Sequence, residues 1–479
     1  MADSVPSAPR DILLAHGYFL AEDEKERQIM RPYPPLGLMY LSAYLAREGV
    51  RVELFDSTLR TRGDLYARLG QGPPSVLGLY TNLITRPSVL AITAEAKRLG
   101  WRVVLGGPES ANYPAEYLAW GADVVVAGEG EVTLTALVPA LAARGPHGLH
   151  GIPGVIFRDE RGAVIENAAR DQIGDLDALP WPDRQSIDMR AYMDIWRTHH
   201  GASSVTMITA RGCPYRCRWC SHAVFGFTHR RRGVMDCANE LEWIRDTYAP
   251  DQIWYADDVF AIHPRWLLDY AAELKRRCLR LPFETISRAD RLLRDDVLAT
   301  LAEMGCYRLW IGSESGSQRI LDAMSRGVTL EQVQQACRAA RRYGIRTGMF
   351  LMWGYDGETL EDIEATIDHA ARALPDVLLT TLAYPIKGTA YFDAVADRVT
   401  LDKPWADASD RDYQVHGRRD RGYYRHADRW LQHHVAAARL DVDAARPDGD
   451  QANREEARRH RFEAQAAREA LIADTEVRS

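Results

Sequence analysis

Apolar and amphipathic stretches alternate along the first 145 residues. Short apolar runs rich in Val, Leu and Ile, each bounded by turn residues, are typical of parallel strands covered on both faces. These runs are residues 11–15, 51–55, 75–80, 102–105 and 123–127. Helical patterns lie between them, and a glycine follows those at 35–48 and 88–99. The alternation predicts an α/β fold that begins with a doubly wound, Rossmann-like sheet over residues 1–145.

A second alternating series starts at residue 204. Its apolar runs have strand length and are separated by helical stretches; they are residues 204–209, 252–255, 282–286, 308–311, 346–352 and 377–383. A full eightfold barrel usually needs about 250 residues. The series therefore predicts a partial (β/α)6 barrel over residues 204–395.

The segments outside these two series have a different composition. Residues 146–203 form a predicted connector, with a hairpin centred on residues 159–162 and a proline-rich stretch at 179–183. From residue 396 the chain becomes highly charged, with Arg, His and aromatic residues mixed together. This pattern predicts a helical carboxyl-terminal region over 396–479, in which a packed helical cap is followed by a solvated terminal helix.

The ends of the amino-terminal strands carry glycine-rich turns. In an open α/β sheet the ligand crevice lies beyond the carboxyl ends of the strands, and glycine lets a backbone approach a large flat ligand closely. A G-x-G motif alone leaves a nucleotide, another large ligand or no ligand as alternatives. The candidate binding residues at these ends are Tyr80, Thr81, Asn82, Gly106, Gly107, Pro108, Gly128, Glu129 and Gly130.

The strands of the second series end on distinctive residues in the same way. Active sites of parallel barrels lie at the carboxyl ends of the strands. The candidates after the second to fifth strands are Asp257, Asp258, Arg288, Glu314, Ser315 and Gly354. Structural alternatives exist, because an Asp often caps a helix and Arg288 could pair with Asp290 alone. The run at residues 229–232, His-Arg-Arg-Arg, favours a solvated loop over a contact with an anionic substrate.

Overall composition limits the classes of function. Lys and Arg number 60 and Asp and Glu 67, so the net charge is −7. This argues against a general nucleic-acid or anionic-membrane binder. No uncharged apolar run reaches the roughly 18 residues of a membrane helix, and the first residues lack a signal-peptide pattern. We therefore expect a cytoplasmic protein without a membrane span.

Three of the seven cysteines, Cys213, Cys217 and Cys220, lie within eight residues, and none occurs before them. Such a cluster does not resemble a disulfide framework; in a reducing compartment it holds a metal or performs redox chemistry. Three thiolates can bind three irons of a cubane cluster and leave the fourth iron open. The alternative is a structural zinc completed by His222. The remaining four cysteines lie in helical or strand patterns and are expected to be buried.

The spacing C-x-x-x-C-x-x-C directly after the first strand of a partial barrel resembles the radical S-adenosylmethionine (SAM) enzymes. The resemblance spans about 204–395 and continues through residues 255–258, 287–290, 311–316 and 353–358. It implies a 4Fe-4S cluster on Cys213, Cys217 and Cys220 as metal ligands and catalytic residues. SAM would chelate the open iron, and one electron would cleave it to a deoxyadenosyl radical that abstracts a substrate hydrogen. Arg288 would suit the SAM carboxylate.

The amino-terminal region resembles the cobalamin-binding domain that precedes this barrel in one subgroup. The resembling stretches are residues 31–38, 106–109 and 128–131. The D-x-H-x-x-G motif that supplies a cobalt ligand in other cobalamin proteins is absent. The resemblance therefore implies cobalamin bound without a histidine ligand.

Together the two domains resemble the cobalamin-dependent radical SAM enzymes. The resemblance implies transfer of a methyl group from methylcobalamin to an unactivated carbon or phosphorus of a small-molecule substrate. It also implies an electron donor such as flavodoxin or ferredoxin. An oxidative cyclase or rearrangement enzyme of the same architecture is the first alternative. An RNA methylthiotransferase would need a second cluster in the cysteine-free amino-terminal domain, and a cobalamin-binding regulator would have no use for the cysteines.

Overall fold

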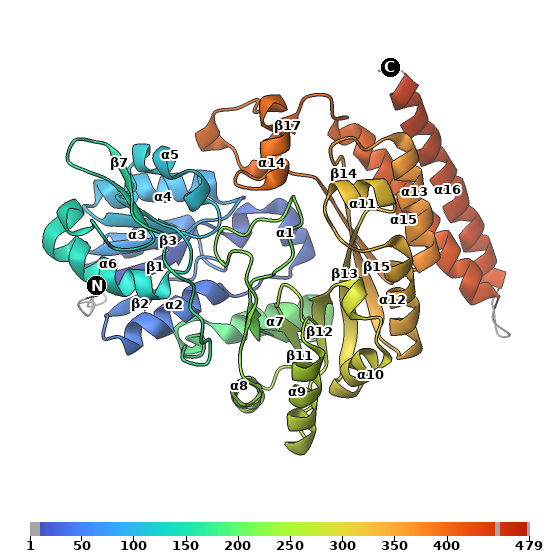
Figure 1. Ribbon diagram of the computed structural model, residues 1–479, viewed down its shortest axis with the longest axis horizontal. Coiled ribbons are helices and arrows are strands. Elements are labelled where there is room, and N and C mark those ends of the chain that lie inside the picture. Colours follow the sequence, from blue (N-terminus) through green and yellow to red (C-terminus); the bar gives the residue numbers. More distant parts are fainter. Residues whose placement is uncertain (1–9, 446–450, 477–479) are drawn as a thin grey trace, which may run out of the picture.

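Two sheets lie side by side in the computed structural model of the chain, which describes residues 10–445 and 451–476 (Figure 1). The outermost residues of the predicted first and last domains, 1–9 and 477–479, lie outside the described residues, as do 446–450. The amino-terminal sheet and the barrel sheet are joined by an irregular segment and by helix α7 (Met189–His200).

The amino-terminal sheet contains the five predicted parallel strands. They run in the order β2-β1-β3-β4-β5, the doubly wound order in which ligands bind at the carboxyl ends of the strands. In register, Ile12 lies opposite Val52 on one side and Val76 on the other. The strands are β1 (Ile12–His16), β2 (Val52–Leu54), β3 (Val76–Tyr80), β4 (Arg102–Gly106) and β5 (Val124–Val126).

Helices cover both faces of this sheet, as its doubly buried strands require. Leu13 packs into one apolar cluster and Leu14 into another, because successive side chains of a strand point to opposite faces. Helices α2 (Leu36–Arg47) and α6 (Glu131–Arg144) contribute to the Leu14 cluster. The Leu13 cluster is built with α3 (Arg62–Leu69), α4 (Arg86–Arg98) and α5 (Pro114–Ala119), and the short α1 (Glu24–Ile29) follows the first strand.

The hairpin predicted inside the connector is present but belongs to the amino-terminal sheet. Strands β6 (Val155–Arg158) and β7 (Val164–Glu166) pair with each other, and β6 also pairs antiparallel with β5. Val155, Ile156 and Phe157 are buried there. The apolar run therefore extends the sheet to seven strands, and residues 155–166 are not part of a separate connector.

The second sheet contains the six predicted parallel strands, in sequential order from one edge to the other. The strands are β8 (Ser204–Met207), β11 (Gln252–Tyr255), β12 (Phe283–Ser287), β13 (Cys306–Glu314), β14 (Arg346–Trp353) and β15 (Val377–Leu382). This is the partial barrel that the sequence predicts. Between β8 and β11, strands β9 (Ala210–Arg211) and β10 (Arg230–Arg231) form a small antiparallel ladder.

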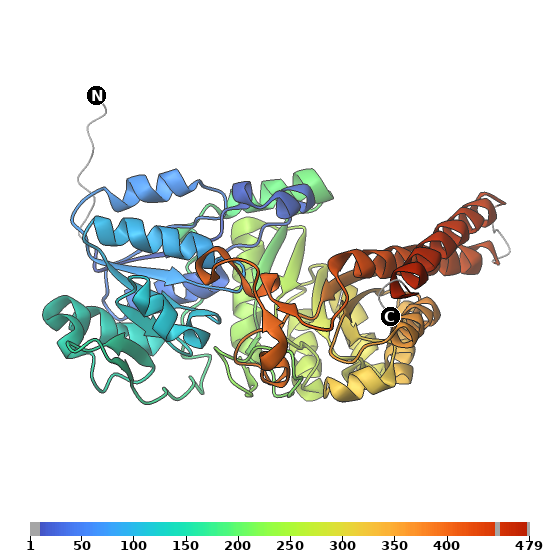
Figure 2. The same cartoon turned by 90° about the horizontal axis from the view of Figure 1, so that it is seen from above.

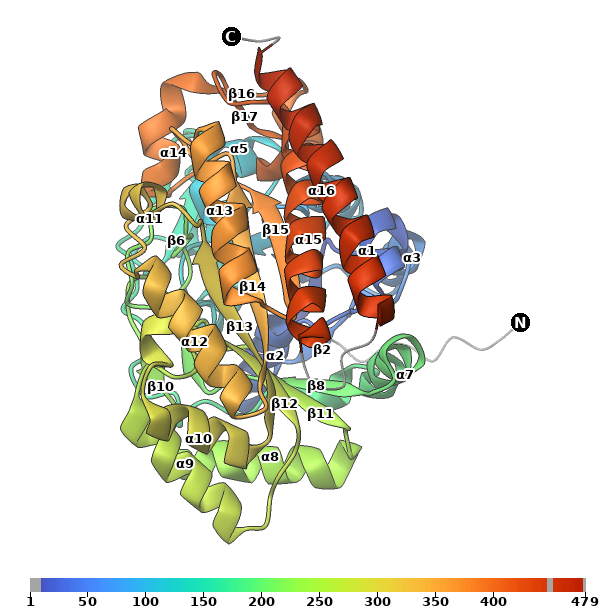
Figure 3. The ribbon, with the colours of Figure 1, turned by 90° about the vertical axis from the view of Figure 1, so that its right-hand side faces the viewer.

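The barrel helices cover the outer face of the second sheet (Figure 3). Capping boxes start two of them, because Thr329 and Gln332, like Thr359 and Asp362, exchange side-chain to backbone hydrogen bonds. The helices are α8 (Val234–Tyr248), α9 (Pro264–Arg276), α10 (Asp295–Met304), α11 (Gln318–Ala323), α12 (Leu330–Arg342) and α13 (Leu360–Ala373).

The prediction of a helical region from residue 396 is wrong for residues 399–420. After α14 (Ala390–Val395) the chain forms short turns and a two-stranded ladder of β16 (Val399–Thr400) and β17 (Gln414–Val415). Five Asp residues and Pro404 in this segment favour turns over a continuous helix. The orange segment bridges the two halves of the molecule in Figure 2.

Two long helices complete the chain, α15 (Arg421–Ala444) and α16 (Gln451–Glu476). They lie antiparallel, with α15 against α13 (Figure 3). The terminal helix is not solvated on all sides, since Ala457, Ala464 and Leu471 are fully or almost fully buried. Among the described residues no helix is both long and apolar enough to cross a membrane.

Candidate active site between the two sheets

Two adjoining cavities lie where the sheets meet. The larger, of about 640 Å³, is lined by Tyr80 and Pro108 from the amino-terminal sheet and by residues of four barrel strand ends. The smaller, of about 120 Å³, is mostly apolar and is lined mainly by residues of the amino-terminal half. Gly37, Tyr80, Arg211, Val224 and Phe225 line both cavities. The two cavities therefore adjoin, so that a ligand bound in one would lie next to a ligand bound in the other.

The predicted glycines form the wall of the smaller cavity. Gly106, Gly107, Gly128, Glu129 and Gly130 all contribute to it. Gly107 has φ +111°, and a Cβ there would lie 2.3 Å from the carbonyl oxygen of Thr81. Only glycine fits this position, so the loop after β4 keeps its backbone bare toward the cavity.

Thr81 and Asn82 shape the neighbouring loops and do not line either cavity. The Thr81 hydroxyl donates to the Gly106 carbonyl at 3.1 Å and accepts from the Ser110 amide at 3.0 Å. The Asn82 side chain accepts from the amide of Ile84 at 3.1 Å. Both side chains hold backbone segments in place.

The three clustered cysteines line the larger cavity together. Their thiols are unpaired, and Cys220 is the most accessible of them. The surrounding protein raises the pKa of Cys220 to about 12 and also raises that of Cys213. The thiols of Cys213 and Cys220 are therefore protonated near neutral pH, and binding iron must release these two protons.

The other cysteines lie elsewhere. Cys237, Cys306 and Cys337 are buried, as expected, whereas the prediction is wrong for Cys278, which is exposed. Among the residues that the structure describes, no three His, Cys, Asp or Glu side chains converge on a point that could hold a single metal ion. His222 lines the same cavity, with Nδ1 3.1 Å from the Gly226 carbonyl and Nε2 buried without a hydrogen-bond partner. A cubane is larger than one ion and binds each cysteine at a different iron.

Arg288 lines the same cavity and is almost fully buried. Its Nε donates to Asp290 at 3.0 Å, its Nη2 donates to the carbonyl of Arg326 at 3.0 Å, and its guanidinium lies 3.6 Å from the centre of the Tyr215 ring. Arg288 Nη1 and Ser287 Oγ are buried without a hydrogen-bond partner. Buried polar atoms of this kind normally have partners, so this wall fits a carboxylate-bearing ligand such as SAM.

Arg326 is a site residue that the sequence reasoning missed. Its Nη1 lies 3.9 Å from Cys217 Sγ, and its Nη2 donates to the Gly312 carbonyl at 2.7 Å. Glu314, at φ +66°, lies 3.7 Å from Arg326, and burial raises its pKa. Arg326 follows a short helix, not a strand, so a search of strand ends does not find it.

The remaining barrel candidates separate into two groups. Asp258 lines the larger cavity, and burial raises its pKa. Asp257 instead accepts hydrogen bonds from the amide and hydroxyl of Thr209, which fixes the chain just before the cysteines.

The last two barrel candidates, Ser315 and Gly354, also contact protein groups. The Ser315 hydroxyl lies 3.2 Å from that of Thr366. Gly354, at φ +71°, is enclosed by Tyr424, which would lie 2.9 Å from an added Cβ. Asp257, Ser315 and Gly354 are supporting residues and do not line the cavity.

The arginines at 230–232 are not a solvated loop. Arg230 pairs with Glu129 at 2.6 Å, Arg231 with Asp257 at 3.4 Å, and Arg232 with Asp236 at 2.5 Å. The side chains of Arg231 and Arg232 are 6% and 4% exposed. The solvated-loop interpretation is therefore wrong, because buried carboxylates neutralise this run.

His16, at the end of β1, is occupied by protein partners on both ring nitrogens. Nδ1 lies 3.2 Å from the Tyr18 amide, and Nε2 lies 3.1 Å from the Ser57 amide and 3.1 Å from Asp56. The ring lines neither cavity. This agrees with a cobalamin site that has no histidine ligand.

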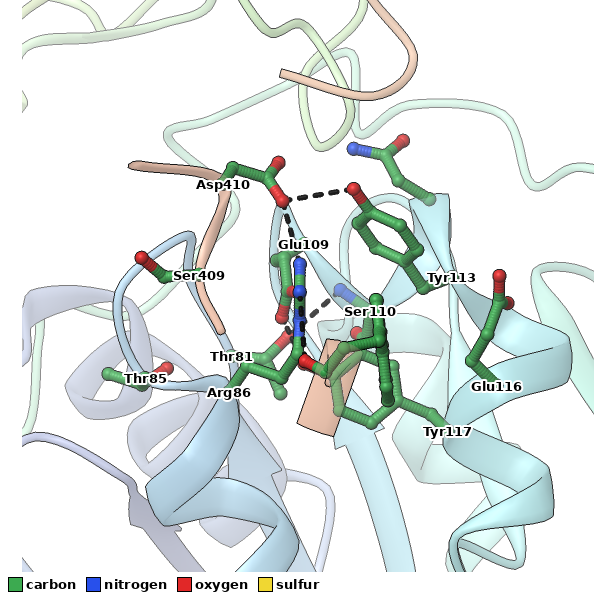
Figure 4. Close-up of polar contacts among 12 residues, drawn as sticks. Thr81, Thr85, Arg86, Glu109, Ser110, Tyr113, Glu116, Tyr117, Ser409 and Asp410 are labelled. Carbon is green, nitrogen blue, oxygen red and sulfur yellow. Dashed lines mark hydrogen bonds and ion pairs between the residues drawn. The ribbon is translucent and has the colours of Figure 1, made fainter. Parts of the chain in front are cut away.

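A buried ionic cluster next to the site joins the amino-terminal sheet to the carboxyl-terminal segment (Figure 4). Arg86 is fully buried and pairs with Glu109 at 2.6 Å and Asp410 at 2.7 Å. Its guanidinium lies between the rings of Tyr113 and Trp405, at 4.6 and 4.5 Å. Burial raises the pKa of Glu109 to about 7 and also raises that of Asp410. One arginine thus faces two carboxyl groups, and both hold a proton more easily than a free carboxylate does.

Two families of known domains match the chain at these two halves. The B12 binding domain matches residues 29–138, and the Radical SAM superfamily matches residues 207–370. These matches define a radical SAM enzyme that carries a cobalamin-binding domain before its barrel.

Relatives along most of the chain agree with this class. The "uncharacterized methyltransferase PH0819" of Pyrococcus horikoshii is 30% identical over 381 residues, which cover 78% of this chain and 81% of that protein. The anaerobic magnesium-protoporphyrin IX monomethyl ester cyclase of Rubrivivax gelatinosus is 25% identical over 78% of this chain and 68% of its own.

The fold is also that of a solved structure. The cobalamin-dependent SAM radical enzyme OxsB, with aqua-cobalamin and SAM bound, superposes with a TM-score of 0.71 at 19% identity, covering 96% of this chain and 72% of that one. The chain belongs to the cobalamin-dependent radical SAM enzymes. The cofactors of this family are a 4Fe-4S cluster, SAM and cobalamin.

Proposed function

We propose that this enzyme is a methyltransferase that uses methylcobalamin to methylate a carbon or phosphorus atom of a small molecule. The observation that carries the proposal is the pair of adjoining cavities, because it brings the glycine-walled cavity of the cobalamin-binding domain next to the cavity lined by the three cysteines. The similarity to a protein named a methyltransferase supports the same activity. When bound, the cofactors supply a hydrogen-abstracting radical and a transferable methyl group.

In this proposal the barrel loops hold the reactive cofactors by side chains. Cys213, Cys217 and Cys220 would hold the cluster and leave it able to bind SAM. Arg288 and Ser287 offer unpaired donors to the SAM carboxylate, and Asp258 and Glu314 offer acceptors on the same wall. Two observations support these roles: the residues line one cavity, and the cysteines form the motif of the radical SAM enzymes.

The amino-terminal loops hold cobalamin mainly by shape. Bare backbone at Gly106, Gly107, Gly128 and Gly130 lets the large macrocycle approach, and Tyr80 stands between the two cavities. With both ring nitrogens of His16 engaged, the protein supplies no imidazole to cobalt from this strand end. The electron that starts the reaction comes from a reductant such as flavodoxin or ferredoxin.

The second candidate is an oxidative cyclase, favoured by the similarity to the anaerobic protoporphyrin ester cyclases. One experiment separates the two without knowledge of the substrate. Cob(I)alamin-loaded protein is incubated anaerobically with SAM that carries a labelled methyl group. A methyltransferase produces labelled methylcobalamin and adenosylhomocysteine, whereas a cyclase has no need of this half-reaction. Absence of both products in protein that retains cobalamin and the cluster would favour the cyclase.

A further inference from the structure

The cysteine-bearing loop is closed at its base by a short ladder. Strands β9 and β10 pair antiparallel, with Arg211 opposite Arg230 and Ala210 opposite Arg231. The loop of residues 212–229 between these strands contains all three clustered cysteines, and Arg211 precedes Cys213 by two positions. The placement of this base therefore decides where the cysteines lie.

Both arginines of this ladder reach across to the amino-terminal sheet. Arg211 donates to Glu129 at 2.8 Å and pairs with Glu131 at 2.7 Å, while Arg230 donates to Glu129 at 2.6 Å. Glu129 also accepts from the amide of Ile173 at 2.9 Å. We call Glu129, Glu131, Arg211 and Arg230 the Glu129 junction.

The Glu129 junction is buried and balanced in charge. The side chains of Glu129, Arg211 and Arg230 are 2%, 5% and 11% exposed. Two carboxylates face two guanidinium groups, and removing one partner of a buried pair leaves an uncompensated charge. The guanidinium of Arg211 also lies 5.0 Å from the Tyr40 ring, and both arginines lie within 6 Å of the Phe225 ring, which belongs to the cysteine loop.

The glutamates of the junction belong to the wall of the smaller cavity, and its arginines belong to the base of the cysteine loop. Glu129 lies between Gly128 and Gly130, whose backbone lines the smaller cavity, and its carboxylate is used by protein partners. Arg211 lines both cavities. A shift of the cysteine loop relative to the glycine loop must therefore break these buried contacts.

We propose that the Glu129 junction is a positioning device that holds the cysteine loop against the glycine loop and so fixes the separation of the cluster from cobalt. This inference rests on the proposed cluster and cobalamin sites. Its residues act through the loops that they connect. The hydrogen bonds are charge-assisted and enclosed, which makes the connection specific in direction as well as strong.

The test compares the wild-type holoenzyme with Glu129→Gln, which removes the charge at nearly constant shape. The wild type and Glu129→Gln are both loaded with cluster and cobalamin, and backbone amide hydrogen exchange is followed in residues 212–229. We expect exchange in this loop to become about 10-fold faster or more in Glu129→Gln. The magnetic interaction between cob(II)alamin and the reduced cluster should change at the same time, which a merely stabilising residue would not produce. Glu129→Asp should restore part of both signals.

Glu116→Gln is the matched control, because Glu116 pairs with Lys387 at 3.4 Å between the same two halves but away from both cavities. It should change neither signal. Should Glu129→Gln not yield folded protein, Arg230→Lys takes its place with the same expected outcome, since Lys loses the guanidinium fork.

Unchanged loop exchange and unchanged magnetic interaction in a variant that binds both cofactors would overturn the proposal. A wild-type protein that binds no cluster through the three cysteines would instead contradict the proposed cluster site. In that case loop exchange in the cobalamin-loaded protein still tests the junction, so the two failures are distinguishable.

Discussion

The two walls of the active site are built in different ways. On the amino-terminal side the wall is glycine backbone and apolar side chains, and the polar residues nearby are occupied with protein partners. On the barrel side the wall carries cysteines, Arg288, Glu314 and Asp258, with unpaired polar atoms among them. In the proposed function, one cofactor is therefore recognised by fit and the other by ligation. Substitutions in the two walls should therefore affect the binding of different cofactors.

The largest effect is expected on the barrel wall. Replacing Cys213 by Ala removes one of three iron ligands, and cleavage of SAM should fall below detection while cobalamin stays bound. Iron content and deoxyadenosine formation are the measurements. Cys278→Ala is the control, because this exposed cysteine lies outside both cavities. A variant without Cys213, Cys217 and Cys220 that still cleaves SAM would contradict the assignment.

Cobalamin binding at the glycine wall should be sensitive to added side-chain volume and insensitive to charge. In Gly107→Ala the new Cβ meets the Thr81 carbonyl and φ is unfavourable, so the loop must move. We expect cobalamin to bind about 10-fold more weakly or worse, with iron content unchanged, as measured by cobalamin titration. Gly174→Ala is the control, because no protein atom lies within 4 Å of its Cβ position and it lines neither cavity, so cobalamin affinity should be unchanged. Equal cobalamin affinity in Gly107→Ala would argue against recognition by fit.

A smaller effect is expected at Arg326. Its positive charge next to Cys217 stabilises the reduced cluster, so Arg326→Gln should lower the reduction potential by roughly tens of millivolts. A redox titration followed by electron paramagnetic resonance measures the shift. Arg319→Gln, whose side chain is 58% exposed, should leave the potential unchanged. A potential that is unaltered in Arg326→Gln would remove this residue from the cluster environment.

The last effect concerns the stability of the fold and not cofactor binding, and it comes from the cluster around Arg86. Because burial raises the pKa of Glu109 to about 7, the protonated form favours the folded state. This contribution is present below the ordinary carboxyl pKa and is lost as the pH rises through 7. The free energy of unfolding should therefore fall with rising pH by up to about 3 kcal/mol more in the wild type than in Glu109→Gln. Chemical denaturation at pH 5 and pH 8 measures this difference, and identical pH dependence would contradict it.

The sequence was most informative where local pattern and packing agree. The strands of both sheets and the shared cavity of Cys213, Cys217 and Cys220 follow from apolar runs, turn residues and a short motif. The pairing of β6 with β5 is a long-range contact that local pattern does not encode.

Side-chain partners were the least predictable feature. Asp257, Glu129, Arg230 and Arg231 are charged residues of a kind found at binding sites or in solvated loops, yet each is paired with a group far away in the sequence. Arg326 was missed for the same reason, since its distance to Cys217 depends on how a loop folds back. A charged residue in a sequence does not show whether its partner is protein, ligand or water.

The ratio of by-products in the complete reaction tests methyl transfer most directly. With substrate present and SAM labelled on its methyl group, deoxyadenosine and adenosylhomocysteine are quantified alongside the product. Our account predicts equal amounts of the two by-products and label in the product. Product that forms with deoxyadenosine but without adenosylhomocysteine or label would contradict methyl transfer and support a cyclase.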